Sequence, residues 1–143
     1  MSLSFRFSLL LVFMALITSC RLNGTKPTAD IKCEERILAE DSKLGKIRNY
    51  ACERQSLSLT IHEYVQGLEA LDFEACPAAF VTAFARHRRA WEAMIPVTDK
   101  HSELRGEMHD LFDQIALSAD STEYKTKLKA IWDTWAEVEA AVN

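Results

Sequence analysis

The sequence predicts an all-α protein, folded as a small antiparallel bundle of four main helices with a short N-terminal helix before them. Apolar residues recur every three or four positions along most of the chain, and no segment alternates between apolar and polar side chains as a strand would. Glycine and proline are scarce, at 4 and 3 residues among 143, whereas β-rich folds need many turns. Long amphipathic segments with short connections favour antiparallel neighbours.

The first two helices are expected on either side of Gly45. A short helix over about 29–41 carries a few apolar residues, and a longer one covers about 46–71. The apolar side of the longer helix is formed by Ile47, Tyr50, Leu57, Ile61, Tyr64, Leu68 and Leu71. The same series continued backwards is mostly polar, so the break between the two helices is placed near Gly45.

Two prolines and a polar pair delimit the remaining helices. Pro77 fits the first turn of a third helix, and Pro96 is expected to end or kink it. Its apolar series is Phe80, Phe84, His87, Trp91 and Met94. Thr98 or Asp99 would cap a fourth helix with the series Leu104, Met108, Leu111, Phe112 and Ile115. After a break at Asp120–Ser121, the last helix carries Tyr124, Leu128, Ile131, Trp132, Trp135, Val138 and Val142.

The charge of the chain argues against nucleic acid as a partner. Lysine and arginine number 17 and acidic residues 21, for a formal net charge of −4. Binding to phosphate backbones needs a basic surface that releases counterions. Electrostatic attachment to anionic lipid needs a basic surface too. A mildly acidic domain suits neither partner.

The first twenty residues have the pattern of an export signal. A single positive side chain, Arg6, precedes an apolar run from Phe7 to Ile17, which is too short to span a bilayer as a helix. Small residues and a cysteine follow, in the order Ile17-Thr18-Ser19-Cys20. This segment resembles the lipobox of bacterial lipoproteins, in which an aliphatic residue and two small residues precede an obligatory cysteine.

The lipobox resemblance implies a lipid-anchored envelope protein. It implies that residues 1–19 are removed, that the Cys20 sulfur carries a diacylglycerol, and that the new amino group is acylated. Several acyl chains hold a protein on a membrane where one would not. Arg21 in place of aspartate implies the outer membrane, facing the periplasm, if the organism has two membranes. Residues 20–28 would form a tether and 29–143 the helical domain.

Three further cysteines are candidates for a disulfide, because an exported chain meets an oxidising compartment. If the chain reverses near Leu44, Cys33 and Cys52 lie at similar distances from the turn, with an offset of roughly 4.5 Å along the helix axis. A disulfide needs Cα atoms roughly 4.4–6.8 Å apart, so this pairing is preferred. A Cys33–Cys76 bridge is the alternative if the first helix folds differently, and three buried free thiols are the remaining one.

Arg54, His87 and Trp91 are the candidate ligand-binding residues. Arg54 interrupts the apolar series of the second helix, so it needs either a carboxylate partner or an anionic ligand. His87 shares the apolar series of Trp91, and the simpler interpretation is a neutral core histidine bonded to Tyr50, Tyr64 or a glutamate. The tryptophans at helical spacing fit core packing as well as a ligand site.

No motif of a known catalytic chemistry is present. The chain lacks a Gly-rich phosphate loop, Gly-x-Ser-x-Gly and His-Glu-x-x-His. It also lacks the Glu-x-x-His pairs of di-iron bundles and the Cys-x-x-Cys-His of covalent haem attachment. The sequence therefore assigns no catalytic residue, no metal ligand and no cofactor, and it does not favour an enzyme.

Two functions are consistent with these features. The preferred one is a binding or structural module of the envelope, anchored by lipid on Cys20 and engaging an envelope protein. The alternative is a bundle in the periplasm that binds a small ligand or a metal through His87, Arg54 and the tryptophans. An exposed apolar groove without a cavity would favour the first, and a closed pocket containing His87 and a carboxylate would favour the second.

Overall fold

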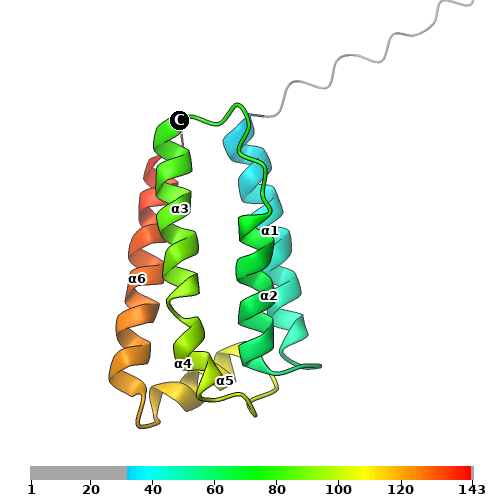
Figure 1. Ribbon diagram of the computed structural model, residues 1–143, viewed down its shortest axis with the longest axis vertical. Coiled ribbons are helices and arrows are strands. Elements are labelled where there is room, and N and C mark those ends of the chain that lie inside the picture. Colours follow the sequence, from blue (N-terminus) through cyan, green and yellow to red (C-terminus); the bar gives the residue numbers. More distant parts are fainter. Residues whose placement is uncertain (1–31, 143) are drawn as a thin grey trace, which may run out of the picture. The chain divides into compact units, whose positions relative to one another are not determined.

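The computed structural model describes residues 32–142, and these residues form a small all-helical bundle, as the sequence predicts (Figure 1). The expected signal peptide, the lipid-bearing Cys20 and the tether lie outside the described residues. The helices are α1 (Cys33–Ala51), α2 (Leu57–Glu69), α3 (Ala78–Glu92), α4 (Ile95–Asp99), α5 (Met108–Ala116) and α6 (Ser121–Ala140). None of these helices is both long enough and apolar enough to cross a bilayer.

The four long helices run alternately down and up the bundle. Helix α1 packs against α2, and α3 packs along α6, so two antiparallel pairs stand side by side (Figure 1). Helix α2 also contacts α3 and α4, which joins the two pairs. The short helices α4 and α5 close one end, and α5 packs against α6.

The bundle is held by a continuous apolar core. Each large apolar side chain withdrawn from water contributes roughly 1.5–3 kcal/mol. All six helices contribute large side chains that are fully buried. These include Ile37, Leu57, Ile61, Leu68, Phe80, Phe84, Met94, Val97, Leu111, Ile115 and Val138. Gly67 lets α2 approach α1 closely, because a Cβ there would lie 2.8 Å from Leu44 Cδ2.

The predicted break near Gly45 is wrong, because α1 continues through it to Ala51. Its inward face follows Ile37, Asp41, Leu44 and Arg48, at helical spacing. Two of these four residues are charged, so an apolar series could not reveal the face. Ile47 and Tyr50, which the apolar series had placed inward, are 64% and 68% exposed.

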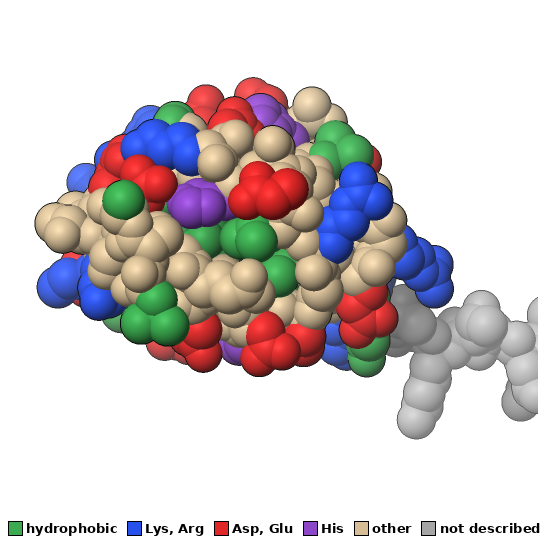
Figure 2. Space-filling view, turned by 90° about the horizontal axis from the view of Figure 1, so that it is seen from below, with side chains coloured by type: hydrophobic (Ala, Val, Ile, Leu, Met, Phe, Trp, Pro, Cys, Tyr) green, Lys and Arg blue, Asp and Glu red, His purple; other side chains and the backbone are tan. Residues whose placement is uncertain are grey.

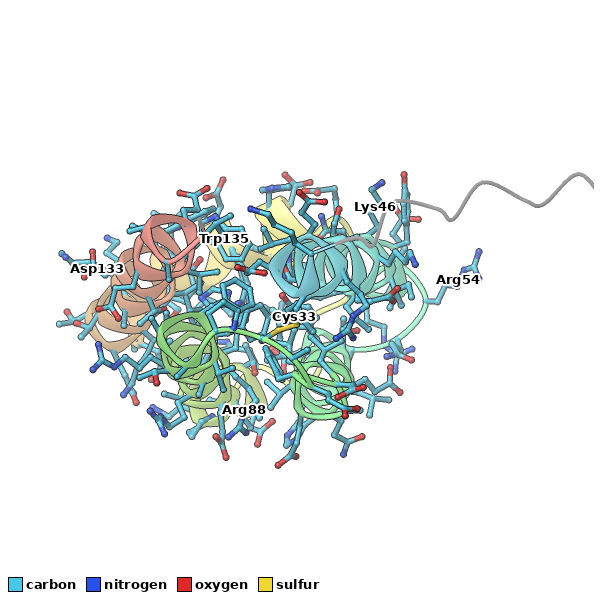
Figure 3. All side chains as sticks on the ribbon, turned by 90° about the horizontal axis from the view of Figure 1, so that it is seen from above. Cys33, Lys46, Arg54, Arg88, Asp133 and Trp135 are labelled. Carbon is cyan, nitrogen blue, oxygen red and sulfur yellow. A yellow bond between two sulfur atoms is a disulfide. The ribbon has the colours of Figure 1, made fainter. Side chains whose placement is uncertain are left out.

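The chain reverses between α1 and α2, at residues 52–56, rather than near Leu44. Ser56 caps α2, since its hydroxyl accepts a hydrogen bond from the Leu59 backbone N–H at 3.3 Å. Arg54 lies in this turn and points away from the bundle into solvent (Figure 3). The prediction that Arg54 faces the core is therefore wrong, because residues 46–71 are two helices and not one.

The second half of the chain follows the predicted order, but the short helix α4 was not predicted, and the next helix begins only at Met108, after Leu104. Helix α3 ends before Pro96, which lies in the first turn of α4, as expected for a residue without a backbone N–H. Thr98 and Asp99 are inside α4 and do not cap the next helix. Glu107 caps α5 instead, because its carboxylate accepts from the backbone N–H groups of His109 and Asp110.

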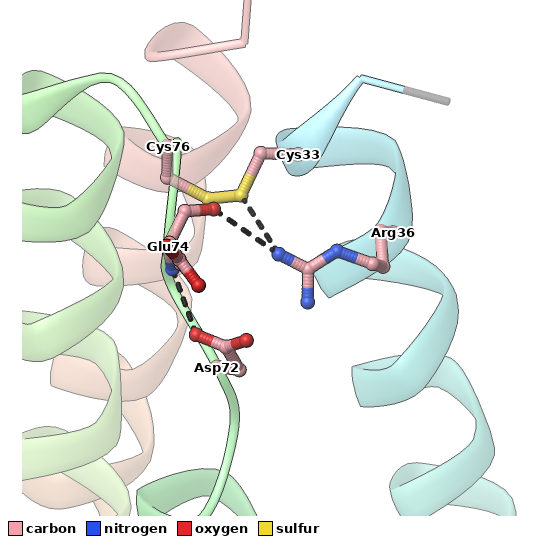
Figure 4. Close-up of a disulfide and its surroundings, with 5 residues drawn as sticks. All are labelled: Cys33, Arg36, Asp72, Glu74 and Cys76. Carbon is pink, nitrogen blue, oxygen red and sulfur yellow. Dashed lines mark hydrogen bonds between the residues drawn. A yellow bond between two sulfur atoms is a disulfide. The ribbon is translucent and has the colours of Figure 1, made fainter. Parts of the chain in front are cut away.

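The disulfide joins Cys33 to Cys76, so the preferred Cys33–Cys52 pairing is wrong and the alternative is correct. Cys33 and Cys52 lie at opposite ends of α1, about 28 Å apart at the rise of an α-helix. Cys33 instead meets the loop before α3, with the two Cα atoms 5.1 Å apart (Figure 4). Arg36 Nη2 supports this end by donating to Cys33 Sγ at 3.4 Å and to the Glu74 carbonyl at 3.3 Å.

Cys52 is a free thiol at the other end of the bundle. It is fully buried, and its Sγ donates to the Arg48 carbonyl oxygen at 3.4 Å. Burial raises the pKa of this thiol above its usual range, which keeps it in the less reactive protonated form.

We predict that non-reducing peptide mapping recovers a Cys33–Cys76 linked peptide. The bridge closes a loop with a sequence separation of 43, so reduction should lower the free energy of unfolding by about 4 kcal/mol on the chain-entropy account. Cys52 should react with a thiol reagent only after denaturation. The Cys52→Ala variant is the control, and it should give the same linked peptide. A linked peptide containing Cys52, from the wild-type protein, would contradict the assignment.

Candidate functional site

A cavity of about 350 Å³ lies within the bundle and is the candidate functional site. Its walls come from α1, α3, α5 and α6, with Tyr64 contributed by α2. It is lined by Asp41, Arg48, Asn49, Tyr64, His87, Trp91, Met108, His109, Phe112, Asp113, Tyr124, Leu128, Ile131, Trp132 and Trp135. Most of this wall is apolar or aromatic, and a few polar groups converge on it.

Arg48 lines the pocket and contacts two aromatic rings and an asparagine. Its guanidinium carbon lies 4.4 Å from the ring centroid of Tyr64 and 4.4 Å from that of Trp91. Contacts of this kind attract a cation to the faces of aromatic rings. Nε and Nη2 both donate to Asn49 Oδ1, at 3.3 and 3.2 Å. Burial lowers the pKa of Arg48, but arginine titrates so far above neutrality that the group stays charged.

Asp41 lies on α1 about two turns before Arg48, with 9% of its surface exposed. The Tyr64 hydroxyl donates to Asp41 Oδ1 at 2.8 Å. Burial raises the pKa of Asp41, while the bond from Tyr64 and the charge of Arg48 act in the opposite direction. Burial and the charge of Asp41 also raise the pKa of Tyr64. Asp41, Tyr64 and Arg48 thus form one coupled polar group.

His87 is buried at 3% exposure, and both of its ring nitrogens have partners. The Trp91 Nε1–H donates to Nε2 at 3.2 Å. Nδ1 lies 3.2 Å from Thr134 Oγ1, and the Thr134 hydroxyl itself donates to the Ala130 carbonyl at 2.7 Å. These directions require a neutral His87 that carries its proton on Nδ1. Burial lowers the pKa of His87 to about 4, which agrees with that state.

The aromatic side chains around the polar group form the apolar part of the site. Tyr64 and Trp91 pack edge to face at 5.0 Å, and His87 lies 5.1 Å from the ring of Trp135. Trp135 lies between α6 and α1 in the view along the bundle (Figure 3). Trp132 is 63% exposed, so it lies where the pocket opens to solvent.

The rim of the pocket carries acidic groups and a histidine. His109 Nδ1 pairs with Glu107 Oε1 at 2.6 Å, and the His109 side chain is 81% exposed. Asp113 is exposed, and its charge adds to burial in raising the pKa of Tyr124 to about 12. The neighbouring end of the bundle shows interspersed acidic, basic and histidine side chains with small apolar patches between them (Figure 2).

The structure brings two of the three predicted ligand-binding residues together. His87 and Trp91 line the pocket, and His87 is also a neutral core histidine, as expected. Its partners are Thr134 and Trp91, not the tyrosines or glutamates that the sequence suggested. Arg54 does not reach the pocket.

Sequence reasoning missed Arg48 and Asp41, which line the pocket from α1. The available signal was their seven-residue separation, two helical turns that place both on the face of Ile37 and Leu44.

The remaining histidines pair with aspartates, His62 at the surface and His101 partly buried. His62 Nε2 lies 3.1 Å from Asp99 Oδ1, which also accepts from the Ser58 hydroxyl. His101 Nε2 lies 3.0 Å from Asp120 Oδ2. Within residues 32–142, no three His, Cys, Asp or Glu side chains are arranged to hold a metal ion.

Comparison of the chain with protein-family models, curated protein sequences and solved structures gives no match.

We predict that His87 makes the protein less stable in acid. The pKa of an unperturbed histidine is 6.5, whereas that of His87 in the fold is about 4, so between these values the unfolded chain binds a proton that the folded chain does not. Stability should be fully present above pH 6.5 and should fall as the pH drops toward 4. The loss is about 3 kcal/mol over that window, because one pKa unit is about 1.4 kcal/mol.

Urea denaturation measures the effect at about pH 7 and about pH 4.5, because these two values enclose most of the pH range between the two pKa values. His87→Gln should remove most of the acid-dependent loss, whereas the exposed His62→Gln control should retain it. Asp41, whose raised pKa acts in the opposite sense, is common to all three proteins and cancels in the comparison. An identical pH dependence for His87→Gln and the wild type would contradict the prediction.

Proposed function

We propose that this protein binds a small organic molecule in the pocket between α1 and α6, and that lipid on Cys20 anchors it in the cell envelope, at the outer membrane where there are two membranes. The observation that carries the binding function is the pocket itself, which combines an apolar wall with an arginine that packs against two aromatic rings. The anchoring rests on the lipobox resemblance.

The size and lining of the pocket support binding of a small molecule. Pockets for small ligands measure roughly 300–1,000 Å³ and are mostly apolar, with a few polar groups that fix orientation. This pocket has about 350 Å³, so its ligand is small. Arg48, Asp41 and Tyr64 supply the polar groups on one side, and Phe112, Leu128 and Ile131 belong to the apolar lining.

The hydrogen bonds around His87 favour binding over catalysis. A general base must offer a free nitrogen to the substrate's proton, but both His87 nitrogens are engaged with Trp91 and Thr134. Among the described residues, those that line the pocket include no serine, threonine or cysteine that could act as a nucleophile. The groups that face the pocket are therefore suited to hold a ligand.

The second candidate is a module that engages an envelope protein. Ile47 and Tyr50 lie one turn apart on α1 and are both mostly exposed, at 64% and 68%. Exposed apolar neighbours of this kind favour a protein contact when they extend to a large patch. The pocket, with its buried charge, is the more specific feature, so small-molecule binding is preferred here.

We predict that the neutral fluorescent probe N-phenyl-1-naphthylamine binds the full-length protein in lipid nanodiscs. Leu128→Trp, which places a larger side chain in the pocket, should weaken binding about tenfold, or about 1.4 kcal/mol. Leu117→Trp is the matched control, because Leu117 is 88% exposed and does not line the pocket. Fluorescence titration gives the dissociation constants after subtraction of an empty-nanodisc titration. Equal affinity in both variants would contradict the pocket as the binding site.

We predict that metabolic labelling with an alkyne fatty acid marks Cys20. Cys20→Ala should abolish the label, because the lipid attaches to the sulfur of that residue. Cys52→Ala is the control and should keep the label, since Cys52 is buried in the bundle. A wild-type protein that takes up no label and fractionates away from membranes would overturn the anchoring proposal.

A further inference from the structure

Among residues 32–142, those that line the pocket include one permanent cation and two carboxylates. Arg48 supplies the positive charge, Asp41 lies about two turns before it on α1, and the exposed Asp113 also lines the pocket. His87 is neutral because of its hydrogen bonds, and His109 is already paired with Glu107. The ligand charge that the pocket favours therefore depends on how far the negative charge of Asp41 compensates the positive charge of Arg48.

Arg48 is incompletely compensated. Within residues 32–142 the guanidinium takes part in no ion pair, although other arginines do so at the surface. Asp41 acts on it through space and is itself bonded to the Tyr64 hydroxyl. A charge withdrawn from water is costly unless a counter-charge approaches closely. The pocket thus offers a cation that an anionic group could neutralise.

The geometry of Arg48 selects the kind of anion. The guanidinium lies over both aromatic rings, and Asn49 engages its Nε–Nη2 side. A guanidinium held in this way can present paired N–H groups, which match the two oxygens of a carboxylate. A doubly charged phosphate group would face the repulsion of Asp41 and Asp113 with only one cation to offset it. The arrangement therefore favours a single negative charge.

The same geometry disfavours a cationic ligand. Aromatic cages bind quaternary amines by surrounding the positive charge with rings. Here the guanidinium already lies over the rings of Tyr64 and Trp91, and it would repel a second cation. The remaining wall is apolar and suits an uncharged body; it comes from Met108, Phe112, Leu128, Ile131 and Trp135.

We propose that the ligand is a small apolar monocarboxylate whose carboxylate pairs with Arg48 and whose body lies against the wall of α5 and α6. This inference rests on the proposed binding function and adds the chemical class of the ligand.

A matched pair of probes tests the proposal, namely 3-phenylpropionate and its uncharged amide, 3-phenylpropanamide. All three tryptophans of the chain line the pocket, so intrinsic tryptophan fluorescence of the full-length protein in nanodiscs reports binding. The acid should bind at least about tenfold more tightly than the amide, since charge-assisted bidentate hydrogen bonds are the stronger ones. 3-Phenylpropylamine should bind more weakly than either.

Three variants assign the preference to Arg48. Arg48→Met should bring the affinity for the acid down to that for the amide. Arg48→Lys should retain part of the preference for the acid, because lysine keeps the positive charge but lacks the paired N–H donors of the planar guanidinium. Arg54→Met is the matched control, since Arg54 is an exposed arginine outside the pocket, and it should leave both affinities unchanged. Circular dichroism checks that each variant is folded.

Equal affinity of the wild-type protein for acid and amide, or tighter binding of the amine, would overturn the carboxylate assignment. So would a preference for the acid that persists in Arg48→Met. Failure of all three compounds would also overturn it. The proposed binding function fails separately, if N-phenyl-1-naphthylamine does not distinguish Leu128→Trp from Leu117→Trp.

Discussion

The packing of Arg48 against the rings of Tyr64 and Trp91 is the interaction on which the polar part of the pocket depends. It joins a side chain of α1 to rings of α2 and α3, so one guanidinium touches three helices. The guanidinium lines the cavity between α1 and α6, and a charge withdrawn from water there needs polar partners.

Several neighbouring features follow from this one charge. Asp41 is buried on the same face of α1, and Tyr64 turns its hydroxyl to that carboxylate while its ring faces Arg48. Trp91 presents its ring face to Arg48 and its N–H to His87. His87 in turn is bonded to Thr134 of α6. Polar and aromatic contacts therefore link α1, α2, α3 and α6 across the bundle, beside an apolar core that is otherwise ordinary.

The sequence was informative where burial follows apolar periodicity. The helices containing Phe84, His87 and Trp91, and the final helix with Ile131 and Val138, were predicted from their spacing, because these residues pack against one another in the α3–α6 pair. Pro96 marked a helix boundary for a local reason, the missing N–H. The burial of His87 also followed from its place in that series.

The same reasoning failed where the inward face is polar. Asp41 and Arg48 occupy core positions of α1, so a search for apolar repeats selected the wrong face and placed Ile47 and Tyr50 inside. That error moved the expected turn to Gly45, and the wrong turn then gave the wrong partner for Cys33. A charged residue at an otherwise apolar spacing was the correct signal for a site, but it was assigned to Arg54 instead of Arg48.

The Cys33–Cys76 bridge has a mechanical consequence. Cys33 is the first residue of α1, and Cys76 lies just before α3, so tension on the chain ahead of Cys33 passes through the sulfur atoms to α3. The 42 residues enclosed between the two cysteines, which include nearly all of α1 and the whole of α2, lie outside this load path. Pulling on the N-terminal side therefore cannot peel α1 away from its end, and the contact between Arg48 and Tyr64 lies wholly within that shielded loop.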